Sequence, residues 1–174
     1  MEHAYAAGLF DGEGTVRVDE YDCPASATRP KPYRRTQLRV AIAMSHYPTI
    51  RSLHDTYGGS IFRDDSAHKR NPNHATRYTW AHWRSGAAEF LTLVLPFLIT
   101  KKEQAAIAIR FQKHIRQCVP IFRKHRGVPP NLDKIRKFRT KLIAELQHHK
   151  AGRFDVPKEK LKAPGRKWPY AGGQ

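Results

Sequence analysis

The alternation of apolar and polar residues along the chain predicts short helices and strands in a regular order. Residues 2–11 carry small and apolar side chains that predict a helix ending near Gly12. Apolar and polar side chains alternate in residues 15–21, which is the pattern of a half-buried strand. Residues 33–44, charged early and apolar late, predict the second strand. Residues 22–32 contain three prolines, so they predict the loop between these two strands.

A second unit of one helix and two strands follows. Apolar side chains recur at helical spacing between Pro48, which suits the first turn of a helix, and Gly58, which suits its end. Two strands are then predicted over 59–64 and 76–83, and the polar, basic residues 65–75 predict the loop that joins them.

The pattern then becomes helical. Ser85 is a suitable cap for a helix that stops at Pro96. Thr100 and Glu103 form a T-x-x-E capping box, which predicts the start of the next helix, over 101–115. The predicted order is α-β-β-α-β-β-α, a mixed α+β fold.

The end of the chain is strongly basic. One helix is predicted over 132–149, followed by a flexible tail rich in Pro, Gly and Lys. About twenty of the 32 Lys and Arg residues follow position 100. We therefore divide the chain into a core, residues 1–117, and a basic C-terminal extension, residues 118–174. The basic helix either contacts phosphates or packs on the core through Ile135, Phe138, Leu142 and Leu146.

Composition narrows the class of partner. The net charge of +17 and the pI of about 10.3 favour a polyanion, with nucleic acid first and an anionic membrane surface second. No apolar run approaches the roughly 20 residues that span a bilayer, and no signal peptide is recognised. The cysteines, Cys23 and Cys118, lack metal-ligand spacing. We expect a protein of the cytoplasm or of an organellar matrix or stroma, not a secreted one.

Two acidic residues alternate with glycines where the first predicted helix ends. Carboxylates at that end of a helix are disfavoured by about 0.3–1 kcal/mol each. Asp11 and Glu13 could form an ordinary solvated turn, with Gly12 and Gly14 supplying backbone freedom. They could instead form a divalent-metal site, because a hard cation prefers carboxylate and carbonyl oxygens. In a strongly basic protein, such a site suggests phosphodiester chemistry.

The stretch AAGLFDGEG resembles the signature of the LAGLIDADG homing endonucleases. The segments YGGSIF, YTW and LPFLITKKEQA agree with the family in the same order, so the resemblance covers residues 4–115. It implies an α-β-β-α-β-β-α core with a curved antiparallel DNA-binding sheet. It also implies an intron-homing, metal-dependent endonuclease that cleaves a long, roughly palindromic double-stranded DNA site and leaves short 3′ overhangs.

The resemblance also implies roles for individual residues. Glu13 corresponds to the catalytic metal ligand of the family, and the carbonyl of Gly12 is a further candidate ligand. Lys101 corresponds to a lysine close to the scissile phosphate, although a solvated lysine is the ordinary alternative. His46 lies where related enzymes carry a polar residue that orders water, and it is the third catalytic candidate. The implied cofactor is Mg²⁺, with Mn²⁺ or Ca²⁺ able to substitute in binding.

The signature occurs once, so the resemblance implies a symmetric homodimer. In the family this helix packs on its copy, and the predicted interface residues are Ala4, Ala7, Gly8 and Asp11. Ordinary packing within one chain is the alternative. We expect no membrane partner and no small-molecule substrate.

Alternate side chains on the sheet are predicted to read base edges in the major groove. The candidates are Arg17, Asp19, Tyr21, Arg35, Gln37, Arg39, Arg63, Asp65, Arg77, Thr79 and His82. Thr79 and His82 cannot share a face on a regular strand. Phosphate contacts are predicted for the loop residues Arg29, Lys31, Lys69 and Arg70.

Two other classes of function are compatible with the charge. One is an RNA maturase or a DNA-binding regulator on the same fold, and the other is a structural RNA-binding protein of ribosomal type. Neither class requires both Glu13 and Lys101. Because both residues are present, the sequence favours the nuclease.

Overall fold

The computed structural model describes residues 1–25, 33–66, 75–124 and 130–150. Its elements are α1 (His3–Glu13), β1 (Gly14–Cys23), β2 (Tyr33–Met44), α2 (Tyr47–Tyr57), β3 (Ser60–Asp64), β4 (Arg77–Trp83), α4 (Arg84–Val94), the short helix η1 (Leu95–Phe97), α5 (Lys102–Lys124) and α6 (Leu132–Lys150). This order confirms the α+β class predicted from the sequence.

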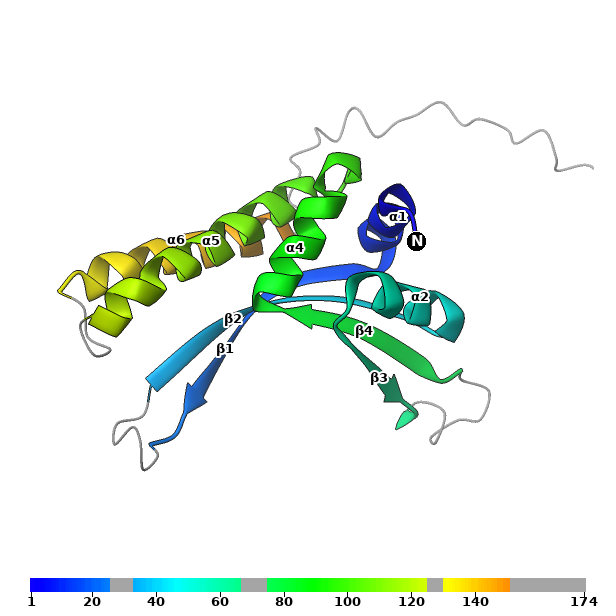
Figure 1. The fold of residues 1–174 in the computed structure, drawn as a ribbon, viewed down its shortest axis with the longest axis horizontal. Helices are drawn as coiled ribbons and strands as arrows, with labels where there is room; N and C mark the ends of the chain where they lie inside the picture. Colours follow the sequence, from blue (N-terminus) through cyan, green and yellow to red (C-terminus); the bar gives the residue numbers. More distant parts are fainter. Residues whose placement is uncertain (26–32, 67–74, 125–129, 151–174) are drawn as a thin grey trace, which may run out of the picture.

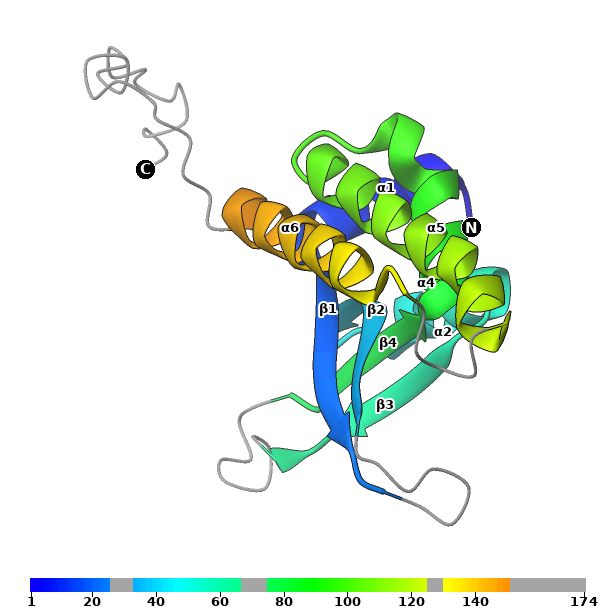
Figure 2. The same ribbon diagram turned by 90° about the vertical axis from the view of Figure 1, so that its left-hand side faces the viewer.

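One antiparallel sheet organises the molecule, with the strand order β1-β2-β4-β3. Figures 1 and 2 show the helices on one side of this sheet, while the strand pairs splay away from them and give the sheet a curved shape. No described helix covers the opposite side of the sheet. We call that side the uncovered face.

The core lies between the helices and the sheet. Val16 and Val40 point into it from β1 and β2, and both are fully buried. The ring of Phe90 on α4 packs edge-on against Phe10 of α1, with centroids 5.3 Å apart, and against Trp80 of β4, at 4.8 Å. These aromatic contacts hold α1 and α4 over the sheet, which fixes the position of the acidic end of α1.

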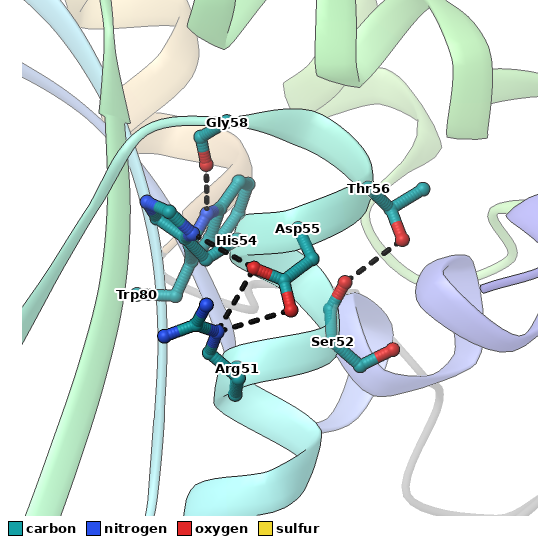
Figure 3. A network of polar contacts seen from close by, with 7 residues as sticks. All are labelled: Arg51, Ser52, His54, Asp55, Thr56, Gly58 and Trp80. Atoms are coloured by element: carbon teal, nitrogen blue, oxygen red, sulfur yellow. Dashed lines mark hydrogen bonds and ion pairs between the residues drawn. The ribbon is translucent and has the colours of Figure 1, made fainter.

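The bounds of α2 confirm the prediction from Pro48 and Gly58. Pro48 lies in the first turn, and Gly58 ends the helix with a φ of 71°. The Gly58 carbonyl accepts a hydrogen bond of 2.7 Å from the Trp80 indole, and Arg51 pairs with Asp55 one turn earlier at 2.9 Å (Figure 3). The indole therefore joins the end of α2 to β4.

Two predicted helix caps are wrong. Helix α4 begins at Arg84, so Ser85 lies inside the helix, and no side chain caps its start. Helix α5 begins at Lys102, and the Thr100 hydroxyl donates to Asp11, so it does not form the predicted capping box with Glu103. In the second case a partner distant in sequence takes the hydroxyl that the local motif would have used.

The predicted boundary between residues 117 and 118 falls inside α5, which continues to Lys124. Helix α6 then packs back along α5, as Figure 2 shows. Ile135, Leu142 and Leu146 are buried as predicted, but Phe138 is 45% exposed and contacts His114. None of the described helices combines the length and the apolar character that a membrane crossing needs.

We expect Gly14→Ala to destabilise the fold by about 1–3 kcal/mol, the usual cost of overpacking. Gly14 donates its N–H to the Phe10 carbonyl at the end of α1. A Cβ at Gly14 would overlap both that carbonyl oxygen and the Phe10 ring. Gly12→Ala is the matched control, because a Cβ there meets nothing within 4 Å. Urea unfolding of both variants tests this, and equal stabilities would contradict it.

Candidate functional site

One carboxylate ties the end of α1 to the loop before α5. Asp11 Oδ2 accepts a hydrogen bond of 2.7 Å from the backbone N–H of Ile99. Asp11 Oδ1 accepts from the Thr100 hydroxyl and from the backbone N–H of Lys101, both at 2.9 Å. The Lys101 ammonium in turn donates to the backbone carbonyl of Asp11. Two segments far apart in the sequence therefore form one unit.

The charges in this unit affect one another. Burial on its own would raise the pKa of Asp11, but the hydrogen bonds from the loop before α5 outweigh it and lower this pKa below its ordinary value. Partial burial lowers the pKa of Lys101, and the negative charges of Asp11 and Glu13 oppose that shift. Asp11 is thus an ionised anchor, and Lys101 lies close enough to Glu13 for their charges to interact.

Glu13, the last residue of α1, has a different environment. Its side chain is exposed and forms no hydrogen bond or ion pair with the described residues. The neighbouring Gly12 is exposed as well. No group of three or more His, Cys, Asp or Glu side chains in the described segments could hold a metal ion. One chain therefore offers one free carboxylate here, beside the ammonium of Lys101.

We expect Asp11→Asn to lower the free energy of unfolding by about 2 kcal/mol, because hydrogen bonds to a charged group are worth about 1.5–3 kcal/mol. Since folding lowers the pKa of Asp11, its stabilisation is present above the ordinary value of 3.8 and is lost as the pH falls through the folded-state pKa. Unfolding curves at pH 7 and pH 3 measure both effects. The control Asp55→Asn breaks an exposed ion pair and should cost less than Asp11→Asn at pH 7.

His46, the third predicted catalytic residue, follows β2 at the start of α2. Its Nδ1 lies 2.8 Å from the Thr49 hydroxyl, in a hydrogen bond within the first turn of the helix. The pairing of Gly14 with Ile42 places His46 at the same end of the β1–β2 pair as Glu13. A role for His46 in ordering water stays a prediction.

The outer surface of α1 carries small residues. Ala4, Gly8 and Gly12 recur every four positions and are all exposed, so they form one line along the helix. Ala7 is fully buried in the core, so the prediction that it faces a second copy is wrong. Asp11, predicted for the same interface, directs its carboxylate to the loop before α5.

Alternate strand residues point to the uncovered face. Val16 is buried on the helical side, so its neighbours Thr15 and Arg17 point the other way. By the strand register, this face carries Thr15, Arg17, Asp19, Tyr21, Arg35, Gln37, Arg39, Ala41, Ala43, Ser60, Phe62, Asp64, Arg77, Thr79, Ala81 and Trp83. The predicted DNA-binding residues of β1 and β2 therefore share one face, and Arg77 and Thr79 of β4 join them.

Three candidates from the third and fourth strands do not belong to this face. Arg63 pairs with Tyr78 and His82 pairs with Val40, all on the helical side of the sheet. Asp65 lies beyond the end of β3, where it accepts a hydrogen bond of 2.9 Å from Arg63. Arg63 and His82 face the helical side because side chains alternate along a strand, so that positions an odd number apart point to opposite faces of the sheet. The predicted phosphate-contacting residues Arg29, Lys31, Lys69 and Arg70 lie outside the described residues.

Polar contacts orient side chains on the uncovered face. Gln37 Oε1 accepts hydrogen bonds from the Tyr21 hydroxyl at 2.9 Å and from Arg84 Nε at 3.2 Å. Arg17 pairs with Asp19 at 2.7 Å. The two hydrogen bonds from Tyr21 and Arg84 give the Gln37 amide a defined orientation, which suits direct reading of a base edge.

Two aromatic residues of the uncovered face were not among the binding residues predicted from the sequence. Trp83 and Phe62 meet edge-on there, with ring centroids 5.8 Å apart. Trp83 has the same parity as Arg77 and Thr79 within the predicted strand 76–83, so alternation alone could have placed it. A tryptophan in a strand is usually buried in the core, as Trp80 is. This general tendency does not favour the assignment of Trp83 to an exposed binding face.

The comparisons with known proteins identify the fold. No protein-family model matches the chain, and no curated protein matches its sequence. The homing endonuclease I-CvuI, in complex with the I-CreI target, matches with a TM-score of 0.62 and 11% identity over 95% of this chain and 84% of that chain. The archaeal intron-encoded homing endonuclease I-Vdi141I, complexed with DNA, matches with a TM-score of 0.60 and 17% identity, over 84% and 82%.

A third match is to the LAGLIDADG homing endonuclease I-LtrWI bound to target DNA, with a TM-score of 0.53 and 17% identity. The match covers 81% of this chain but 44% of I-LtrWI, so this chain corresponds to less than half of that protein. At these identities the likeness establishes the architecture. The chain has the fold of the LAGLIDADG homing endonucleases, as the resemblance of its sequence implied.

Proposed function

We propose that this protein is a homodimeric, site-specific endonuclease that cleaves both strands of DNA with a divalent metal ion and leaves short 3′ overhangs. The observation that carries the proposal is the unit at the end of α1. There the loop before α5 brings Lys101 next to a free Glu13, directly before the first strand of the basic, uncovered face. The solved proteins with this fold include homing endonucleases complexed with DNA.

The residues present fit a hard divalent cation such as Mg²⁺. Glu13 is an exposed carboxylate without a partner in the described structure, and carbonyl oxygens are available where α1 ends. Asp11 does not fit, because both of its oxygens already accept hydrogen bonds. A related homing endonuclease, I-CvuI, was solved with its target in the presence of Ca²⁺ and with the I-CreI target in the presence of Mg²⁺.

A bound divalent cation supplies activation of water and stabilisation of the leaving oxygen in phosphodiester hydrolysis. In this chain, Glu13 would hold the cation. Lys101 presents a positive charge to the scissile phosphate, and its partial burial strengthens that interaction by excluding water. Asp11 keeps Lys101 in place through the hydrogen bond to its backbone.

A second copy of the chain completes the site. One chain contributes one free carboxylate, whereas cutting two strands requires two active centres. The exposed line of Ala4, Gly8 and Gly12 allows the backbones of two helices to approach closely. Apolar side chains beside α1 support the same surface: Tyr5 is 55% exposed, and Ile99, tied to Asp11, is 86% exposed.

The test is a cleavage selection. The purified protein is incubated with Mg²⁺ and a randomised double-stranded DNA library, and the cut ends are sequenced. We expect one long, roughly palindromic site, with staggered cuts that leave 3′ overhangs. Sequence-independent binding with no cut ends at any metal concentration would overturn the nuclease. Preferential binding of structured RNA would instead favour the maturase class.

Binding should weaken steeply with salt. Each neutralised phosphate contributes a slope of about −0.9 to log K against log[salt]. Each chain carries +17, so a dimer carries twice that charge and should make on the order of ten such contacts. Fluorescence anisotropy between about 50 and 200 mM salt measures the slope. A slope near zero would show that phosphates do not dominate binding.

A further inference from the structure

Among the described arginines of the sheet, Arg39 alone has a buried side-chain nitrogen without a hydrogen-bond acceptor. Arg17 pairs with Asp19, and Arg34, on the helical side of β2, pairs with Asp22 at 3.3 Å. In the described part of the chain, Arg39 contacts no carboxylate. Its Nε is buried and has no hydrogen-bond acceptor. The free protein therefore holds a cationic side chain on the uncovered face with one donor nitrogen that no described group satisfies.

The Arg39 side chain lies against an aromatic pair, Trp83 and Phe62. Arg39 is the register partner of Trp83, and its Cζ lies 5.6 Å from the centroid of the indole ring. Phe62, 47% exposed on β3, packs against the other rim of the indole at an interplanar angle of 86°. A cation–π contact of this kind leaves the terminal N–H groups of the guanidinium available to a ligand, although Nε is buried.

The surface next to Arg39 is hollowed. A hollow of about 240 Å³ opens on the uncovered face, lined by Thr15, Arg17, Arg39, Ala41, Ala43, Arg77 and Thr79. The two alanines leave room for the edge of a base to approach the strands closely. The arginines around them make the hollow positive, which excludes a cationic ligand and suits the acceptor-rich edge of guanine.

We propose that Arg39, positioned by its stack on Trp83, reads a guanine by donating two hydrogen bonds to the N7 and O6 atoms. A bidentate arginine–guanine pair is the commonest specific contact in the major groove. A guanidinium fixed in its plane satisfies the geometric requirement of that pair better than a freely rotating one. This inference rests on the proposed DNA-binding function, and it adds a base specificity and a positioning residue.

The experiment uses the target obtained by selection. Each guanine is replaced in turn by 7-deazaguanine, which keeps base pairing but removes the N7 acceptor, and binding of the full-length protein is measured. We expect one guanine in each half-site whose replacement weakens binding by about tenfold. In Arg39→Lys this sensitivity should disappear. Arg34→Lys is the matched control, because the same change on the same strand lies on the helical side and should keep the full profile.

The positioning role of Trp83 is tested by measuring how strongly the protein discriminates guanine from the other bases. In Trp83→Leu the preference for guanine should fall at the base position that Arg39 reads, while the salt dependence of binding stays constant. Trp83→Phe keeps an aromatic face and should retain most of that preference. An unchanged 7-deazaguanine profile in Arg39→Lys, with binding to all sequences weakened equally, would show a phosphate contact and overturn the inference. Failure to select any target would instead reject the proposed function.

Discussion

Glu13→Gln should lower cleavage by about a thousandfold or more and leave DNA binding intact. A neutral amide is a weak ligand for a hard cation, so the active centre loses its metal while the shape of the residue is retained. Glu13 forms no hydrogen bond or ion pair with the other described side chains, so we expect the fold to tolerate the loss of its charge. Removing a negative charge beside phosphates should, if anything, tighten binding. Single-turnover cleavage and anisotropy measure the two quantities.

The control for this variant is Glu2→Gln. Glu2 precedes the first turn of the same helix and is exposed, so the change in net charge is equal while the position is at the opposite end. Glu2→Gln should cleave at the wild-type rate. Cleavage at that rate by Glu13→Gln would show that another residue holds the metal. Loss of binding together with cleavage would mean that Glu13 supports the fold.

The order of the elements and the composition of the uncovered face could be predicted from local patterns. Alternation along residues 15–21 and 33–44 places arginines and apolar residues on opposite sides of a strand, and the register preserves that separation across the sheet. Alternation also explains why Arg63 and His82 were wrongly included. Each lies an odd number of positions from a residue of its strand that points to the uncovered face, so it points to the helical side itself. Choosing residues by polarity alone does not take this alternation into account.

The anchor at Asp11 could not be predicted in the same way. Its partners, Ile99, Thr100 and Lys101, follow four strands and three helical segments, and no local pattern relates segments that distant. The surface of α1 posed a different problem. Ala4, Ala7 and Gly8 are all small, so their polarity does not show which of them faces the core. Packing against Phe90 and the sheet turns Ala7 inward and leaves Gly8 outside.

Gly8→Leu should convert a dimer into a monomer and abolish double-strand cleavage. A Cβ at Gly8 meets nothing within 4 Å in its own chain, and the position is exposed, so we expect a single subunit to accommodate leucine. A symmetric interface meets the substitution twice. At about 1–3 kcal/mol for each overpacked contact, association should weaken about thirtyfold or more. Sedimentation equilibrium at micromolar concentration measures this, and we expect the wild type to be a dimer.

Two further variants separate assembly from folding. Gly8→Ala adds one carbon and improves helix propensity, so the subunit should become slightly more stable while association weakens less than with leucine. Ala144→Leu enlarges an exposed residue of α6, far along the chain from α1, and should leave the dimer intact. In the proposed dimer two Glu13 side chains reach the DNA, so cleavage of the second strand should follow the dimer fraction across this series. A wild-type protein that remains monomeric on its DNA target would contradict the arrangement, since one chain carries one free carboxylate at the end of α1.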